Sequence, residues 1–139
     1  MQKECTFAKI KYMNIPENLK YTQDHEWVLI DEDGKSAVVG ITDFAQQELG
    51  DIVYIEIETQ GDEIAQGEIF GTVEAVKTVS DLIMPLSGTV LEVNEELEGG
   101  PEEVNDDPYG KGWMIRIELM DKDRSALISS EEYGALIGV

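Results

Sequence analysis

The sequence predicts a small, mainly β protein, a flattened barrel or sandwich with a few short helices, including one at the C-terminus. From Glu26 onward, apolar residues mostly alternate with polar ones or form short apolar runs, as in β-strands. Glycine-containing turns interrupt these runs often, and patterns with helical spacing are few and short. A chain of 139 residues with 42% hydrophobic residues suits one domain with a real core.

The first predicted element is a β-hairpin. Residues 27–30 and 36–40 are rich in apolar and β-branched side chains. The segment between them ends in Asp33-Gly34, a pair that is typical of tight hairpin turns. These two runs are therefore expected to pair antiparallel.

A short helix is predicted at residues 43–49. Thr42 or Asp43 can cap its first turn, because both side chains offer an oxygen to free backbone N–H groups. Gly50 suits the position after the last turn, where many helices end in a left-handed residue.

The middle of the chain has four predicted strands, at residues 51–58, 68–76, 79–84 and 88–93. The second and third are close enough to pair as a hairpin, which places Lys77 at its tip. Ser87 lies in the turn Pro85-Leu86-Ser87-Gly88 and is interpreted as a turn residue, not a nucleophile. Gly88 is expected to adopt a positive φ there.

Four elements are predicted near the C-terminus: a short turn at residues 102–105, a last strand at 113–119, and helical pieces at 123–127 and 130–137. Ser129 or Ser130 can cap the final helix.

The charge of the chain limits its partners. Thirty acidic residues against ten basic ones give a net charge of −20. Such a surface repels phosphate backbones and anionic lipids, so nucleic acid and membranes are not expected as partners. An acidic surface of this kind serves either solubility alone or the steering of basic partners. The single cysteine, Cys5, cannot form an internal disulfide, which favours a reducing compartment and an incidental thiol.

The first twelve residues are predicted to be a poorly ordered N-terminal extension, because Met13-Asn14-Ile15-Pro16 resembles a protein start. Residues 13–139 are then expected to form one domain. Neither a signal peptide nor a transit peptide is recognisable, so the expected location is the cytoplasm of a prokaryote.

Lys77 is the most informative residue. Between Lys35 and Lys111, a stretch of 75 residues contains eighteen carboxylates and Lys77 as its one basic residue. Its predicted hairpin tip lacks the Gly or Asn that a tight turn usually needs. Either the turn presents an amine for modification, or Lys77 forms a surface ion pair with Glu74 or Asp81, worth under about 1 kcal/mol.

The neighbourhood of Lys77 resembles the lipoyl-lysine signature of glycine cleavage H proteins. The signature residues are Glu74-Ala75-Val76-Lys77-Thr78, Ser80-Asp81 and Pro85-Leu86-Ser87-Gly88. The same order and spacing extend over about residues 13–138, through Leu19-Lys20-Tyr21-Thr22, His25-Glu26-Trp27-Val28, Val39-Gly40-Ile41-Thr42-Asp43, Ala45-Gln46, Leu49-Gly50-Asp51-Ile52-Val53, Val104-Asn105, Pro108-Tyr109 and Gly112-Trp113-Met114. Biotinyl carriers would have Met on both sides of the lysine, where this chain has Val76 and Thr78. Phe44 departs from the family, in which many members have His.

This resemblance implies a fold, a cofactor and a set of partners. The fold is the barrel-sandwich hybrid of lipoyl domains, and the cofactor is lipoate, linked covalently to Lys77. The chain would be a non-enzymatic, monomeric carrier of an aminomethyl group. It would serve glycine decarboxylase (P protein), aminomethyltransferase (T protein) and dihydrolipoyl dehydrogenase (L protein), and a lipoate ligase or lipoyl transferase would modify it. A lipoyl relay to other apo-proteins, or an interaction domain with unmodified Lys77, stay as alternatives.

Several other polar residues are candidates for roles near Lys77. Glu74 and Asp81 are candidates for recognition of the lysine. Glu26 and Glu48, together with Asp81, are candidates to line a cleft that shields an amine-bearing arm, the alternative being simple solvation. His25 is the single histidine, so no histidine-cluster metal site is predicted, and a structural role is favoured for it over a catalytic one.

Overall fold

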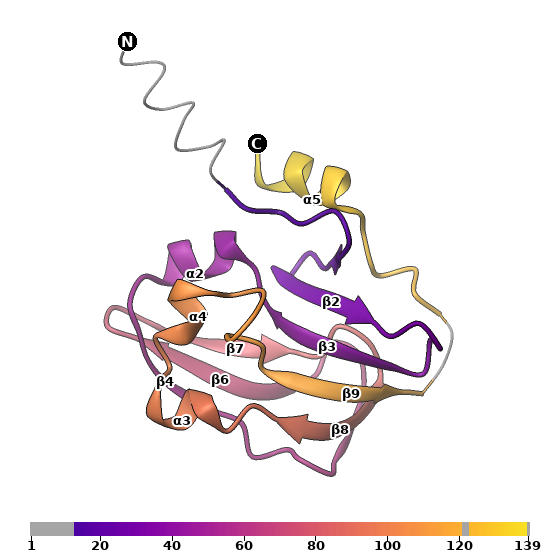
Figure 1. Cartoon of the computed structure of the whole chain (residues 1–139), viewed down its shortest axis with the longest axis horizontal. Coiled ribbons are helices and arrows are strands. Elements are labelled where there is room, and N and C mark those ends of the chain that lie inside the picture. The colour runs from indigo at the N-terminus through magenta and orange to yellow at the C-terminus, as the bar shows by residue number, and fades with distance from the viewer. Residues whose placement is uncertain (1–12, 121–122, 139) are drawn as a thin grey trace.

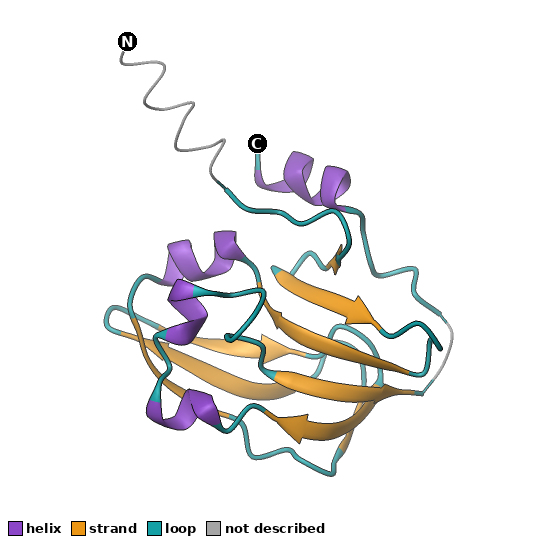
Figure 2. Ribbon diagram, in the orientation of Figure 1, coloured by secondary structure: helices purple, strands orange, loops and turns teal. Residues whose placement is uncertain are grey.

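The computed structural model describes residues 13–120 and 123–138 and has two antiparallel sheets, with short helices at their edges (Figures 1 and 2). The larger sheet has the strand order β1 (Lys20–Tyr21), β2 (Glu26–Ile30), β3 (Ser36–Ile41), β9 (Ile115–Leu119), β8 (Gly88–Val93), β5 (Glu63–Ile64). The smaller sheet has the order β4 (Ile52–Glu56), β6 (Ile69–Ala75), β7 (Val79–Ile83). The mainly β prediction is confirmed, and within the described residues the sheets form a sandwich, not a closed barrel.

The main core lies between the two sheets. Val28, Val39 and Ile117 of the larger sheet belong to one buried cluster with Val73 and Leu82 of the smaller sheet. The buried positions do not alternate strictly: Glu26, Trp27 and Val28 of β2 are all buried, whereas β6 buries Phe70, Val73 and Ala75. Each large apolar side chain in this cluster contributes about 1.5–3 kcal/mol relative to exposure.

The first hairpin forms as predicted. β2 pairs with β3 in the register Val28↔Val39, and Gly34 in the turn has a φ of 71°. Trp27 lies opposite Gly40, where a Cβ atom would come within 2.6 Å of its Nε1. The indole therefore needs glycine at position 40.

The predicted helix α2 (Asp43–Leu49) is confirmed, and Thr42 is its cap. The Thr42 hydroxyl accepts a 3.1 Å hydrogen bond from the N–H of Ala45. The carboxylate of Asp43 instead accepts from the N–H of Asn14 at 3.0 Å. Gly50 follows the helix with a φ of 78°.

The C-terminal helix α5 (Ser130–Ile137) is confirmed with Ser129 as its cap. Ser129 and Glu132 form a reciprocal capping box, in which each side chain accepts from the other's backbone N–H. Tyr133 fastens this helix to the sandwich, because its ring stacks on Tyr21 at 4.8 Å and its hydroxyl lies 2.7 Å from the Thr42 hydroxyl.

The prediction of a helical piece at residues 123–127 was wrong. The Asp123 carboxylate accepts a hydrogen bond from the N–H of Ser125, and Leu127 N–H donates to Arg124, which makes an isolated turn. Ile128 then pairs with Tyr21, so the chain is already extended there.

The expected positive φ at Gly88 was also wrong. Gly88 is the first residue of β8, and glycine is needed because a Cβ would overlap the carbonyl oxygen of Glu118 in β9. The short strands β1 and β5 and the helix α3 (Glu96–Gly99) were not anticipated. The turn at 102–105 is a single helical turn, α4 (Glu103–Asp106).

The predicted N-terminal extension, residues 1–12, lies outside the described residues. Among the residues that the structure describes, no helix has the length and apolarity needed to cross a membrane.

Candidate functional site around Lys77

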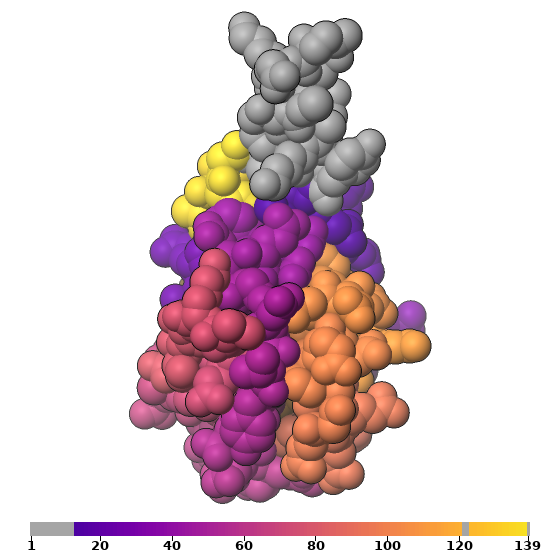
Figure 3. All heavy atoms as spheres, turned by 90° about the vertical axis from the view of Figure 1, so that its left-hand side faces the viewer, coloured from indigo at the N-terminus to yellow at the C-terminus, as the bar shows by residue number. Residues whose placement is uncertain are grey.

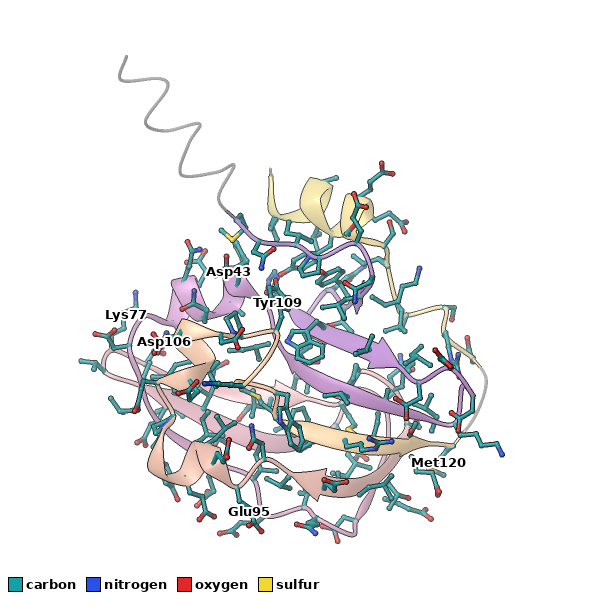
Figure 4. All side chains as sticks on the ribbon, in the orientation of Figure 1. Asp43, Lys77, Glu95, Asp106, Tyr109 and Met120 are labelled. Carbon is teal, nitrogen blue, oxygen red and sulfur yellow. The ribbon has the colours of Figure 1, made fainter. Side chains whose placement is uncertain are left out.

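Lys77 lies at the exposed tip of the hairpin formed by β6 and β7 (Figure 4). Glu74 pairs with Val79, and the N–H of Ala75 donates to the carbonyl of Thr78 at 2.8 Å. Neither Val76 nor Lys77 has a positive φ, since His25 is the only such non-glycine residue in the described ranges. This explains why the tip needs neither Gly nor Asn.

The Lys77 side chain extends over the end of α2. A Cβ atom at Gly50 would lie 3.4 Å from Cε and 3.8 Å from Nζ of Lys77. Figure 3 shows the hairpin tip in pink against the purple chain that leaves α2. Within the described residues, Lys77 has no salt bridge to Glu74 or Asp81, so the ion-pair interpretation fails for this conformation.

A cleft of about 360 Å³ opens between α2, β7 and the turn before β2. Its apolar lining consists of Ile41, Phe44, Ala45, Leu49, Val73 and Leu82. Its polar lining consists of Asp24, His25, Glu26, Glu48, Ser80 and Asp81. Leu49 lines this cleft and immediately precedes Gly50, the residue beside Cε and Nζ of Lys77, so the cleft adjoins the end of α2 that the lysine side chain reaches.

The structure brings three of the candidate carboxyl groups together. Glu26, Glu48 and Asp81 all line this cleft, with Glu48 and Asp81 exposed at its surface. Glu74 does not line it. Glu74 instead lies exposed in the hairpin, between Tyr54 of β4 and Val79 of β7.

Glu26 is buried, not solvated. Its side chain is 2% exposed, and its Oε2 accepts a 2.7 Å hydrogen bond from the N–H of Ile83. Its Oε1 is buried without a hydrogen-bond partner in the described part of the chain. Burial raises the pKa of Glu26 to about 9, so its carboxyl group is neutral at pH 7.

His25 has structural contacts at the edge of the cleft. It adopts a φ of 66°, and its carbonyl accepts a 3.1 Å hydrogen bond from the N–H of Thr42. Its Nδ1 lies 2.9 Å from the Tyr133 hydroxyl, and its ring packs on Phe44 at 4.9 Å. Burial lowers the pKa of His25. The helix α5 thus supports the turn that carries Glu26 into the cleft.

Four exposed apolar side chains lie in or beside the hairpin that carries Lys77, and the sequence did not predict their exposure. Val76 is 75% exposed and Val79 60%, and Val53 and Tyr54 of β4 are about half exposed. Valine in a predicted strand is normally assigned to the core. The apolar patch of these four residues is therefore visible only in the structure, in which their side chains face outward.

Across residues 13–120 and 123–138, no three His, Cys, Asp or Glu side chains are grouped so that they could hold an ion.

Comparisons with known proteins show which family the chain belongs to. The family model described as "Glycine cleavage H-protein" matches residues 19–138. A crystal structure of a glycine cleavage system H protein from Mycobacterium marinum superposes with a TM-score of 0.83 and 37% sequence identity, covering 90% of this chain and 100% of that one. The chain belongs to the glycine cleavage H-protein family.

Proposed function

We propose that Lys77 is the residue to which a lipoyl group is attached, and that the chain acts as a non-catalytic carrier in glycine cleavage. The observation that supports this most is the position of Lys77, exposed at the tip of an antiparallel hairpin near a half-apolar cleft. Loop tips on rigid sheets are where a protein can offer a group to several enzymes in turn.

The cleft fits a lipoyl arm that carries an amine. The lipoyl group supplies a disulfide and dithiol that can accept and release an aminomethyl group. Phe44, Leu49 and Leu82 offer an apolar wall to the alkyl part of the arm. The orphaned Oε1 of Glu26 is a buried acceptor without a partner among the described residues, which an amine N–H would satisfy.

Glu26 would then act by holding the amine and its proton. A neutral carboxyl in an apolar cleft becomes a carboxylate readily when an ammonium group is next to it, because the two charges stabilise each other. Glu48 and Asp81, exposed at the surface of the cleft, would add negative potential. The result is a shielded site for the loaded arm between visits to its partner enzymes.

The partners we propose are the P, T and L proteins of glycine cleavage, with a lipoate ligase or lipoyl transferase as the modifying enzyme. The carrier would meet them as a monomer. The apolar residues Val76, Val79 and Tyr54 would contact these enzymes, while Glu74 and Asp81 provide local negative charge. The net charge of −20 would speed encounter with basic rims on the partners.

A purified lipoate ligase tests the attachment residue. We expect a mass gain of one lipoyl group, mapped by peptide analysis to Lys77 and abolished in Lys77→Arg. The matched variant Lys35→Arg, at another exposed position, should be modified normally. Lipoate found on Lys35 or Lys111 would refute the assignment.

Reconstitution tests the carrier role. Lipoylated protein with P, T and L enzymes should support glycine-dependent turnover, and Lys77→Arg should not. If lipoylated protein gave no turnover but donated its lipoyl group to other apo-proteins, the relay function would replace the proposed one.

A further inference from the structure

One side chain connects the two walls of the candidate site. Asn105, in the single turn α4, donates through Nδ2 to Oε1 of Gln46 at 2.9 Å and to the carbonyl of Gly50 at 2.9 Å. Its Oδ1 accepts from the N–H of Ile52 at 2.9 Å. One amide therefore uses both donor hydrogens and its oxygen on α2 and on the chain that leaves it.

The segment that Asn105 holds is the support of the lysine tip. Asp51, between the two backbone groups bound by Asn105, accepts a 3.0 Å hydrogen bond through its carbonyl from the N–H of Val76. Val76 immediately precedes Lys77, whose side chain lies over Gly50. In Figure 3 this segment runs between the pink hairpin and orange α4.

The second anchor of Asn105 is on the helix that lines the cleft. Gln46 belongs to α2, and Ala45, Glu48 and Leu49 of the same helix form one wall of the cleft. Asn105 is thus bonded to the element that shapes the cleft and to the segment that supports the attachment point. The same side chain therefore holds the segment beside Lys77, where the proposed arm is attached, and the helix that lines the cleft, where its free end would lie.

We propose that Asn105 is a positioning residue for Lys77, which fixes the hairpin tip relative to α2 and thereby sets where the lysine and its arm can reach. This inference rests on the proposed modification of Lys77. Asn105 touches none of the reacting atoms. Its effect passes through the segment Gly50-Asp51-Ile52 to the backbone of Val76.

The chain contains a matched control. Asn94 also donates through Nδ2 to two carbonyls, of Lys111 at 2.9 Å and Trp113 at 2.8 Å, and accepts through Oδ1 from the N–H of Glu96 at 3.2 Å. Its bonds organise the β8–α3 corner and do not reach Lys77. Asn94→Asp and Asn105→Asp therefore make the same chemical change in two equivalent bonding patterns, and one of them supports the lysine.

Two measurements on the folded proteins test the proposal. In Asn105→Asp, amide hydrogen exchange of Val76 should accelerate relative to wild type, and kcat for acylation of Lys77 by lipoate ligase should fall about tenfold with KM little changed, because docking persists while orientation is lost. In Asn94→Asp, Val76 exchange and kcat should match wild type at a comparable loss of stability in urea. Asn105→Ser, which keeps a short polar group, should recover part of kcat.

Each outcome decides the proposal. Equal effects of the two Asp variants on kcat, or unchanged Val76 exchange in Asn105→Asp, would show that Asn105 has only a structural role. If Asn105→Asp did not fold, amide hydrogen exchange in the wild type would still test the proposal. A segment held by Asn105 should open as one unit, so the amides of Ile52 and Val76 should show the same protection. Independent opening would overturn the proposal. Failure of the wild type to be acylated at all would instead refute the proposed function.

Discussion

Oε2 of Glu26 in β2 accepts a 2.7 Å hydrogen bond from the backbone N–H of Ile83 in β7, so a carboxyl group of the larger sheet meets the backbone of the smaller one. The contact lies where the two sheets border the cleft, and it fixes Glu26 so that its other oxygen stays buried. Removing the acceptor would leave a backbone N–H without its partner, at a cost of about 1–3 kcal/mol.

The first prediction concerns the pH dependence of stability. The pKa of Glu26 is about 9 in the folded protein and 4.5 in the unfolded reference state. Between these two pH values, Glu26 is protonated in the folded protein and ionised in the unfolded chain. Its contribution to stability is present below pH 4.5 and is lost as the pH rises toward 9, with a slope of up to about 1.4 kcal/mol per pH unit. Glu26→Gln keeps an oxygen acceptor for Ile83 and cannot ionise. The free energy of unfolding of this variant minus that of wild type should therefore rise with pH.

Urea denaturation at several pH values between 5 and 9 measures this difference, with exposed Glu48→Gln as the control. Parallel stability curves for Glu26→Gln and wild type would mean that Glu26 is ionised in the folded protein.

The second prediction concerns Gly50→Ala. Gly50 has a φ of 78° and a ψ of −152°, a region that side chains avoid, and an added Cβ would contact Lys77. We expect a loss of about 1–3 kcal/mol of stability and slower lipoylation of the folded protein. Gly67 also has a positive φ, 88°, but its Cβ would meet nothing within 4 Å. Gly67→Ala should therefore cost stability and leave lipoylation intact, and equal lipoylation of both variants would contradict the prediction.

The third prediction concerns Gly88→Val. A side chain here meets the Glu118 carbonyl across the β8–β9 pair, so the strands must separate, at a cost of about 2–4 kcal/mol. β8 belongs to the larger sheet and the lysine hairpin to the smaller one, so we expect the folded fraction to be lipoylated normally. Thermal unfolding with Gly99→Ala as control, whose Cβ is in open space, provides the check. A stable Gly88→Val would show that this close approach is relieved easily.

The fourth prediction concerns the acidic surroundings of Lys77. The double variant Glu74→Gln, Asp81→Asn should fold normally, because both side chains are exposed. It should be lipoylated more slowly than wild type at low salt, and the gap should narrow at high salt, since screening acts over about 8–10 Å near physiological ionic strength. The control Glu32→Gln, Glu63→Gln removes the same charge from exposed positions on the larger sheet and its turn. Equal lipoylation rates of the double variant and the wild type at every ionic strength would mean that Glu74 and Asp81 do not steer the ligase and that the acidic surface serves only solubility.

Local pattern was enough to place most elements and the lysine. The hairpin of β2 and β3, the helix α2 and the capped helix α5 depend on alternation, a Gly turn or a cap within a few residues, and the sequence contains those signals directly. The position of Lys77 between two short strands is equally local. The same kind of local signal can also mark a turn. Asp123 was expected to begin a helix, but its carboxylate accepts from the N–H of Ser125 in an isolated turn, and the predicted helix does not form.

Tertiary structure decided what surrounds the lysine, because those contacts join residues far apart in the chain. Nothing near Asn105 in sequence indicates that its side chain binds the N–H of Ile52, 53 residues earlier. The burial of Glu26 depends on β7, since its partner Ile83 is 57 residues later. Glycine is needed at position 88 because the backbone of β9 approaches too closely for a Cβ atom, and not because of a positive φ. Side-chain chemistry at Lys77 is thus readable from sequence, whereas the burial and hydrogen bonding that shape its site arise only when the two sheets pack together.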